Sequence, residues 1–378
     1  MPGPFSEPRA AYIHVPFCAH RCGYCDFTLV ARKDHLIEDY LVALELELKS
    51  LEVPREIDTL FFGGGTPTHL SAPQLRKLCE LAKAWFRLAG DGEFSVEANP
   101  AGFDADKVDV LAEAGVNRIS LGAQSFRSEL LRVLERDHRP DEIAEVVERV
   151  RTRIRNISLD LIFGVPGQDP DEWRADLKSV VELSPTHIST YGLTFEKGTT
   201  FWSRRRAGSL LPVADEDERE MYEAAMTDLP AAGYRQYEIS NFARPGFECR
   251  HNRVYWNGQP YFGFGPGAAS YVGGTRRTNH RSVTNWLKRV LCGESGVAES
   301  ETLSPENRAR EAIMLGLRQT AGIEREAFAD RFGISLHELA GTEIERFAEQ
   351  GLLDCDRGRV RLTRAGRMVA DTVVAEFL

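Results

Sequence analysis

The sequence has no run of apolar residues near the roughly 18 that a membrane span needs. Residues 1–9 contain three prolines and no apolar stretch, so they do not resemble a secretory signal. We therefore expect a cytoplasmic protein without a transmembrane segment, in a compartment that keeps thiols reduced. Internal repeats and low-complexity tracts are also missing, which argues against a fibrous or disordered protein.

An excess of positive charge is missing too. Lys and Arg total 47 and Asp and Glu total 57, which gives a net charge of −10. Sequence-independent binding of nucleic acid needs a cationic surface, so no nucleic-acid partner is expected. With 42% hydrophobic residues among 378, the chain has enough apolar material for two or three globular domains.

Short β-like runs alternate with helical patterns through the first half of the chain. Strands that alternate with helices at this spacing predict parallel βαβ units. Six units fit a partial (β/α)6 TIM-type barrel of the α/β class, and a doubly wound open sheet is the alternative. The predicted strands span residues 11–15, 57–62, 93–97, 117–121, 157–163 and 186–191.

The pattern changes after residue 205. An aromatic and glycine-rich stretch at 242–271 has little periodicity, and the last part of the chain predicts three helices, a hairpin and a final helix. This last part resembles a winged-helix module, although the acidic total and the lack of a Lys-rich recognition helix argue against DNA binding. The predicted domains are a barrel, a connecting region and a winged-helix-like domain, at residues 1–205, 206–300 and 301–378.

Three of the seven cysteines, Cys18, Cys22 and Cys25, have the spacing C-x3-C-x2-C just after the first strand. In a β/α barrel this is the end where loops carry the chemistry. Thiolates bind iron–sulfur clusters, and three ligands leave one iron of a four-iron cluster open. Two alternatives remain: a zinc site with His14 or His20 as fourth ligand, or a redox pair formed by Cys22 and Cys25.

Polar residues follow the later strands. Gly63–Gly65 ends the second strand and permits close approach of the backbone to a ligand. Glu97, Gln124 and Asp160 lie at the ends of, or within, the next three strands. A charged residue in an apolar strand is costly unless paired. Asp160 and Arg136 are therefore candidates for a structural ion pair, unless Arg136 binds a carboxylate of a ligand.

The cysteine spacing, with an aromatic residue before the third Cys, resembles the signature of radical S-adenosylmethionine (radical SAM) proteins. The resemblance implies a partial barrel of six βα units and a [4Fe-4S] cluster held by Cys18, Cys22 and Cys25. The open iron of such a cluster binds the amine and carboxylate of SAM. By the same resemblance the SAM contacts are Tyr12, Gly64, Gly65, Thr66, Glu97, Gln124, Arg136 and Asp160.

Two functions within this family compete: oxygen-independent coproporphyrinogen III oxidase and heme chaperone. The oxidase motif continues with a fourth Cys, where this chain has Phe27, and the oxidase has a long segment before the cluster, where this chain has seventeen residues. Residues 251–256, His-Asn-Arg-Val-Tyr-Trp, resemble the HNxxYW motif of the chaperones. The resemblance favours a heme chaperone and leaves open whether the chain is an enzyme.

A histidine beside aromatic side chains can ligate heme iron while the aromatics pack on the porphyrin. We expect His251, Tyr255 and Trp256 to bind heme; the alternatives are a histidine satisfied within an aromatic loop, or Cys249 as a thiolate ligand. The run Arg204–Arg206 is either a solvated face or a contact for heme propionates. The implied partners are heme, hemoprotein acceptors such as membrane-bound respiratory enzymes, and a heme donor such as a bacterioferritin-like protein.

Overall fold

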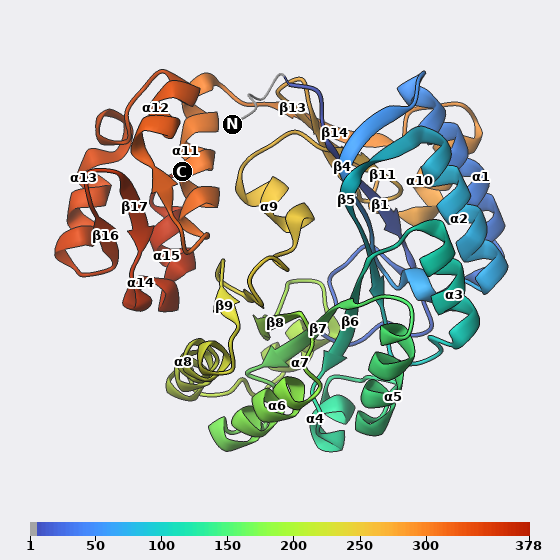
Figure 1. Cartoon of the computed structure of the whole chain (residues 1–378), viewed down its shortest axis with the longest axis horizontal. Helices are drawn as coiled ribbons and strands as arrows, with labels where there is room; N and C mark the ends of the chain where they lie inside the picture. Colours follow the sequence, from blue (N-terminus) through green and yellow to red (C-terminus); the bar gives the residue numbers. More distant parts are fainter. Residues whose placement is uncertain (1–5) are drawn as a thin grey trace.

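The computed structural model describes residues 6–378, so the first five residues of the predicted barrel domain lie outside the described residues. Figure 1 shows a large α/β body, a smaller C-terminal body and a short helix, α9 (Arg250–Trp256), between them. The two bodies have separate hydrophobic cores. This division agrees with a C-terminal domain of its own, as the change in sequence pattern indicates.

Six parallel strands form the centre of the large body. They pair in chain order, without the reversal that defines a doubly wound sheet, so the sheet is singly wound and the predicted partial barrel is confirmed. The strands are β1 (Ala10–Val15), β4 (Arg55–Gly64), β5 (Phe86–Ala98), β6 (Arg118–Gln124), β7 (Asn156–Phe163) and β8 (His187–Gly192).

Helices of the barrel cover the outer face of these strands (Figure 1). They are α1 (Ile37–Leu48), α2 (Ala72–Trp85), α3 (Ala105–Ala114), α4 (Ser128–Val133), α5 (Pro140–Arg151) and α6 (Pro170–Glu182). α6 begins where Asp169 and Glu172 form a capping box around Pro170. α2 ends at Trp85, because Phe86–Leu88 pair with β4 and lengthen β5.

The barrel sheet is larger than the sequence predicts. β11 (Phe262–Phe264) pairs in parallel with β1 at one edge, and β10 (Asn241–Ala243) and β9 (Arg235–Gln236) extend the other edge beyond β8. Strands of two or three residues have no detectable periodicity, which explains why the glycine-rich stretch gave no signal. These three strands lie after residue 205 and still join the barrel sheet. The domain boundary at residue 205 stays a prediction.

The remaining elements of the large body lie around this sheet. The helices are α7 (Thr200–Arg206), α8 (Asp215–Ala231) and α10 (Val283–Leu291), with short 3-10 turns at 34–36, 49–51 and 67–69. Two small strands, β2 (Phe17–Cys18) and β3 (Val30–Ala31), pair across the cysteine loop. A three-stranded sheet contains β12 (Ala269–Val272), β13 (Thr275–Asn279) and β14 (Val297–Thr302).

The C-terminal body has the predicted three helices and hairpin. The final helix is broken at Val369, whose backbone is not helical. A three-stranded wing, β15-β17-β16, packs with the helices around one core. The elements are α11 (Pro305–Leu317), β15 (Ile323–Glu324), α12 (Arg325–Phe332), α13 (Leu336–Glu349), β16 (Leu353–Cys355), β17 (Arg359–Leu362), α14 (Arg364–Met368) and α15 (Ala370–Ala375).

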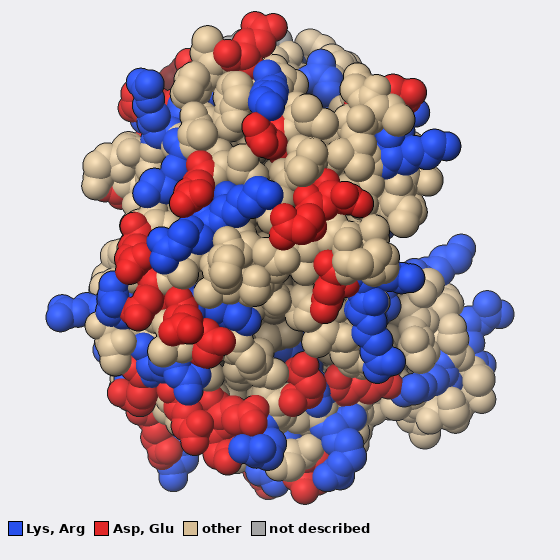
Figure 2. Space-filling model, turned by 90° about the vertical axis from the view of Figure 1, so that its right-hand side faces the viewer, with Lys and Arg blue, Asp and Glu red and all other residues tan. Residues whose placement is uncertain are grey.

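The face that carries α1 and α2 shows basic and acidic side chains interspersed (Figure 2). Ion pairs bridge neighbouring helices there, for example Lys77 with Glu38 and Arg76 with Glu113. Mixed charge of this kind lacks the field that a nucleic-acid surface needs. Within residues 6–378, no helix is long and apolar enough to cross a membrane.

Candidate functional site

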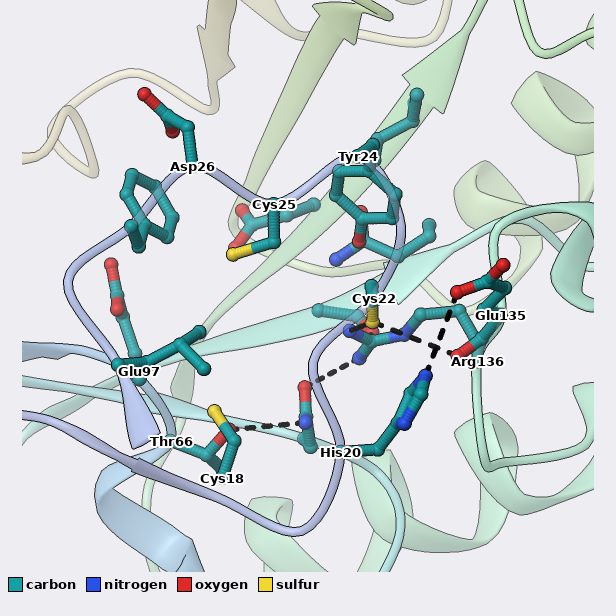
Figure 3. A pocket seen from close by; sticks show the side chains of 18 of the residues that line it. Cys18, His20, Cys22, Tyr24, Cys25, Asp26, Thr66, Glu97, Glu135 and Arg136 are labelled. Atoms are coloured by element: carbon teal, nitrogen blue, oxygen red, sulfur yellow. Dashed lines mark hydrogen bonds and ion pairs between the residues drawn. The ribbon is translucent and has the colours of Figure 1, made fainter. Parts of the chain in front are cut away.

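A cavity of about 340 Å³ opens at the carboxyl ends of the barrel strands. The three sulfur atoms of Cys18, Cys22 and Cys25 lie around this one space (Figure 3). We call this cavity the cysteine pocket. It also brings together seven of the eight residues expected to contact SAM: Gly64, Gly65, Thr66, Glu97, Gln124, Arg136 and Asp160.

The glycine loop after β4 fixes the start of the cysteine loop. The Gly65 amide donates to the Val15 carbonyl and the Thr66 amide to the Phe17 carbonyl, both at 2.8 Å. The Thr66 hydroxyl then lies 3.2 Å from the sulfur of Cys18. A Cβ on Gly65 would approach the Phe17 carbonyl oxygen to 2.8 Å. These glycines therefore allow two protein segments to approach each other closely, in addition to the approach of a ligand.

Gly64→Ala is expected to destabilise the fold by about 2–3 kcal/mol. Gly64 has a φ of +109°, which L side chains rarely adopt, and a Cβ there would lie 2.3 Å from the His14 ring. Urea unfolding measures the loss. Gly90→Ala is the matched control, because a Cβ at that position meets nothing within 4 Å. Equal unfolding free energies for the two variants would contradict the packing described here.

The thiols of Cys18 and Cys25 lie in surroundings that favour their protonated form. Burial raises the pKa of Cys18 to about 11 and also raises the pKa of Cys25. A metal centre must therefore displace these protons when it binds. The cysteine loop is shaped by Arg21, whose guanidinium donates to the carbonyls of Cys25, Phe27 and Leu29.

The zinc alternative finds no support at its proposed fourth ligands. Both nitrogens of His14 are engaged, with the Tyr12 hydroxyl at 3.0 Å and the Thr28 carbonyl at 2.6 Å. His20 lies 3.7 Å from the carboxylate of Glu135. Among the described residues, no three His, Cys, Asp or Glu side chains gather closely enough to hold one metal ion. All seven cysteines are free thiols, including Cys22 and Cys25.

Two half-buried carboxylates, Glu97 and Asp160, face the cysteine pocket. Glu97 accepts a hydrogen bond from the Gly64 amide at 2.9 Å, and burial raises its pKa to about 7. Burial also raises the pKa of Asp160, although hydroxyls surround it and oppose the shift. These hydroxyls belong to Ser120, Ser158 and Ser189 and donate at 2.9, 3.1 and 2.6 Å.

Arg136 does not pair with Asp160, so the predicted ion-pair alternative is wrong. Its guanidinium donates to Asn99 Oδ1 at 2.5 Å, to the Gly122 carbonyl at 3.1 Å and to the sulfur of Cys22 at 3.7 Å. Three serine hydroxyls donate to Asp160, and the positive charge of Arg118 also favours its carboxylate, so Asp160 does not depend on Arg136. The role of Asn99, which also donates to the Thr66 hydroxyl at 3.2 Å, was missed from the sequence.

A second cavity, also of about 340 Å³, adjoins the cysteine pocket. It contains Tyr12, the eighth residue expected to contact SAM, and Tyr255 of the HNxxYW motif. The two cavities share Phe27, Gly64 and Glu97 as lining residues. The motif and the cysteine loop therefore meet at a common wall, although they are more than 200 residues apart in the sequence.

The HNxxYW motif forms α9. The carboxylate of Glu93 accepts from the amides of Arg250 and His251, both at 3.1 Å, and so holds the first turn of the helix. Its last turn contacts the C-terminal body: the guanidinium of Arg318 lies 5.5 Å from the ring centroid of Trp256, and Gln319 donates to the Trp256 carbonyl. Glu93 gave a weak signal in the sequence, as an acidic residue at the start of a buried strand.

His251 is 1% exposed, and both ring nitrogens are engaged. Nδ1 lies 2.8 Å from the Thr59 hydroxyl and Nε2 lies 2.9 Å from the Tyr255 hydroxyl. Burial lowers the pKa of His251 to about 3, so the ring is neutral. This conformation is the satisfied histidine that the sequence left as an alternative.

Cys249 and the basic run are also placed. The thiol of Cys249 donates to Glu93 at 3.5 Å, and burial raises its pKa to about 12, which does not favour a thiolate ligand. Arg204 lies beside the cysteine pocket, where it forms an ion pair at 2.8 Å with Glu135. The run at 204–206 is thus partly a paired contact at the pocket and not wholly a solvated face.

Comparisons with known proteins agree with this geometry. The sequence matches the radical SAM superfamily over residues 12–180 and the HemN C-terminal domain over residues 303–369. A heme chaperone HemW from Bacillus subtilis is 40% identical over 98% of this chain and 99% of its own length. The chain belongs to the HemW family of radical SAM proteins. A HemW from Lactococcus lactis is 38% identical over 98% of both chains.

The fold has a solved counterpart. The coproporphyrinogen III oxidase HemN of Escherichia coli superposes with a TM-score of 0.87 over 99% of this chain and 90% of its own. At 24% identity this likeness concerns the fold alone. The radical SAM family implies a [4Fe-4S] cluster and SAM as cofactors of this HemW-family chain. Three thiols facing one pocket are the donor set that such a cluster needs.

Proposed function

We propose that this protein is a heme chaperone, which binds a [4Fe-4S] cluster, SAM and heme and delivers heme to hemoproteins. One observation carries the proposal: the relatives that match nearly the whole chain at 38–40% identity are named heme chaperones. Phe27 adds support, because the oxidases place a fourth cysteine at this position. The competing function, coproporphyrinogen oxidation, rests on a fold that both groups share.

Cys18, Cys22 and Cys25 hold the cluster in this proposal. When bound, such a cluster supplies one-electron chemistry to SAM. Arg136 lines the pocket and contacts the sulfur of Cys22 at 3.7 Å, and its positive charge offsets the negative charge of the thiolates. Thr66, bonded to the sulfur of Cys18, orients the first ligand.

SAM occupies the remaining space of the cysteine pocket, in contact with the residues named above. The N–H groups of its methionyl amine suit the carboxylate of Glu97 as an acceptor, and its ribose hydroxyls suit Asp160, which has serine hydroxyls on its other sides. Gln124 offers both a donor and an acceptor from one amide. Tyr12 lines the second cavity, which Glu97 also lines.

The affinity for SAM is expected to rise between about pH 6 and pH 8. Burial raises the pKa of Glu97 to about 7, so the free protein holds a proton there below neutral pH. Accepting a hydrogen bond from the SAM amine requires release of that proton, which costs up to about tenfold in affinity per pH unit below the pKa. Equilibrium dialysis at several pH values measures this. Glu97→Gln should flatten the profile, and an unchanged profile in that variant would contradict the assignment.

We propose that heme meets the HNxxYW motif through the second cavity, where Tyr255 and Phe27 are both at the wall. Tyr255 and Tyr261 contact each other edge to face at 4.7 Å between ring centroids and provide aromatic surface for a porphyrin. For His251 to ligate iron, Nε2 must exchange its hydrogen bond with Tyr255 for the metal. Trp256 supports the motif from the side of the C-terminal body.

The partners and the compartment belong to the same proposal. Acceptors would be hemoproteins, including membrane-bound respiratory enzymes, and a bacterioferritin-like protein would be a donor. Seven free thiols fit a reducing cytoplasm.

Heme transfer tests the proposed function. Heme-loaded protein is mixed with the apo form of a b-type cytochrome, and the absorbance of the holo-cytochrome is followed. We expect transfer from the loaded protein even when a heme scavenger removes free heme from solution. Transfer that the scavenger abolishes would contradict delivery by this protein.

A further inference from the structure

Gln124 lies at the centre of an unusually tight turn. Its φ is +64°, in the left-handed region that residues other than glycine rarely adopt. The Ser125 amide donates to the Ala123 carbonyl at 2.8 Å, so the turn closes over a single residue. A turn of this type with a positive φ is the rare, strained form of the γ-turn. Strain of this kind persists only where surrounding contacts hold it.

The turn also interrupts the pairing between β6 and β7. Leu121 is opposite Leu159, but Gln124 is opposite Leu161, so β6 contains one extra residue. A bulge of this kind redirects the side chain that follows it. Here it places Gln124 at the wall of the cysteine pocket, with its amide folded over Gly122: a Cβ on Gly122 would lie 2.7 Å from the amide nitrogen.

Asp176 of α6 holds this turn from behind. Its carboxylate accepts from the Ser125 hydroxyl at 2.6 Å and from the Phe126 amide at 2.9 Å. On the other side, His138 donates to the Ala123 carbonyl at 3.0 Å. Contacts on both sides of Gln124 therefore hold the backbone in the strained turn, from which it would otherwise relax.

Asp176 is 1% exposed and shares its helix face with Trp173, Leu177 and Val180, which are all buried. Burial of a carboxylate among apolar side chains is costly, and an apolar residue would serve packing better. Burial raises the pKa of Asp176 to about 6, which reflects this cost. The carboxylate offsets this cost by its two hydrogen bonds to the turn.

We propose that Asp176 is a positioning residue that holds Gln124 in its strained turn so that the Gln124 amide is preset to contact SAM. The inference rests on the proposed binding of SAM in the cysteine pocket. Asp176 acts through Ser125 and Phe126 and does not contact the ligand. Without it, the turn relaxes to an ordinary backbone conformation and the amide leaves its place in the pocket.

The test measures SAM affinity by equilibrium dialysis on cluster-reconstituted protein under anaerobic conditions. Asp176→Ala, which removes both hydrogen bonds to the turn, and Gln124→Ala are each expected to weaken binding about tenfold, and the double variant no more than Gln124→Ala alone, because both changes remove the same contact. The iron content should stay at the wild-type level in all of them. Asp171→Ala, which removes an exposed carboxylate from the same helix, is the matched control and should bind SAM as the wild type does.

The double variant separates positioning from a general loss of structure. A further tenfold loss when Asp176→Ala is added to Gln124→Ala, or wild-type affinity in Asp176→Ala, would overturn the positioning role. Wild-type protein that binds no SAM would instead overturn the proposed function, and this ligand role with it. If Asp176→Ala does not fold, Ser125→Ala removes one of the two hydrogen bonds from the turn side and is expected to weaken SAM binding in the same direction.

Discussion

Cys22→Ala is expected to leave the reconstituted protein without its [4Fe-4S] cluster. Cys18, Cys22 and Cys25 line one pocket, and two thiolates cannot hold three irons of a four-iron cluster. Cys22 is the thiol that receives the Arg136 guanidinium, so its loss also leaves that buried cation without its sulfur partner. The measurement is iron and acid-labile sulfide per chain after anaerobic reconstitution, together with the visible absorbance of the cluster.

Cys292→Ala is the matched control, because this exposed free thiol lies on the surface beyond α10. It should reconstitute as the wild type does. Iron and sulfide retained at wild-type levels in Cys22→Ala would contradict the ligand assignment. Zinc in place of iron, with no binding of SAM, would favour the zinc site that the spacing also allows.

His251→Ala is expected to weaken heme binding roughly tenfold or more, which corresponds to about 1.4 kcal/mol or more. The proposal makes His251 an iron ligand, and Tyr255, bonded to its Nε2, lines the cavity where heme would enter. The variant also loses hydrogen bonds with Thr59 and Tyr255 and should be about 2–4 kcal/mol less stable. Heme titration followed by absorbance, and urea unfolding without heme, measure the two effects separately.

His187→Ala separates loss of a ligand from loss of packing. His187 is also a fully buried barrel histidine with both nitrogens engaged, by the hydroxyls of Ser158 and Tyr237. Its replacement should cost similar stability and leave heme affinity near the wild-type value. An unchanged heme titration in His251→Ala, or an equal loss in both variants, would reject the ligand role and leave His251 as a core residue.

The six strands of the barrel could be predicted because short β-like runs alternate with helical patterns at the spacing of βαβ units. β11 could not be predicted, since its three residues pair with β1 from about 250 positions away in the sequence and carry no local pattern. The helix α9 could not be predicted either, because the residues that hold it are distant in the sequence. Glu93 holds its first turn, and Arg318 and Gln319 contact its end.

The site was predictable where residue type alone limits the chemistry, as for the three cysteines. It was less so where partners decide the role. Asp160 and Arg136 have suitable charges for each other, but the fold gives Asp160 three serine hydroxyls and gives Arg136 the oxygens of Asn99 and Gly122. Asp176 left no signal at all, because its partners in the turn at Gln124 are defined only by the packing of α6.

The central claim, that this protein carries heme and does not oxidise porphyrinogen, is tested most directly by one anaerobic assay. Cluster-loaded wild-type protein is given reductant, SAM and coproporphyrinogen III, and a heme titration is run on the same preparation. If the protein is a heme chaperone, we expect stoichiometric binding of heme and unchanged coproporphyrinogen. Conversion to protoporphyrinogen, with 5′-deoxyadenosine formed in proportion to the product, would contradict it.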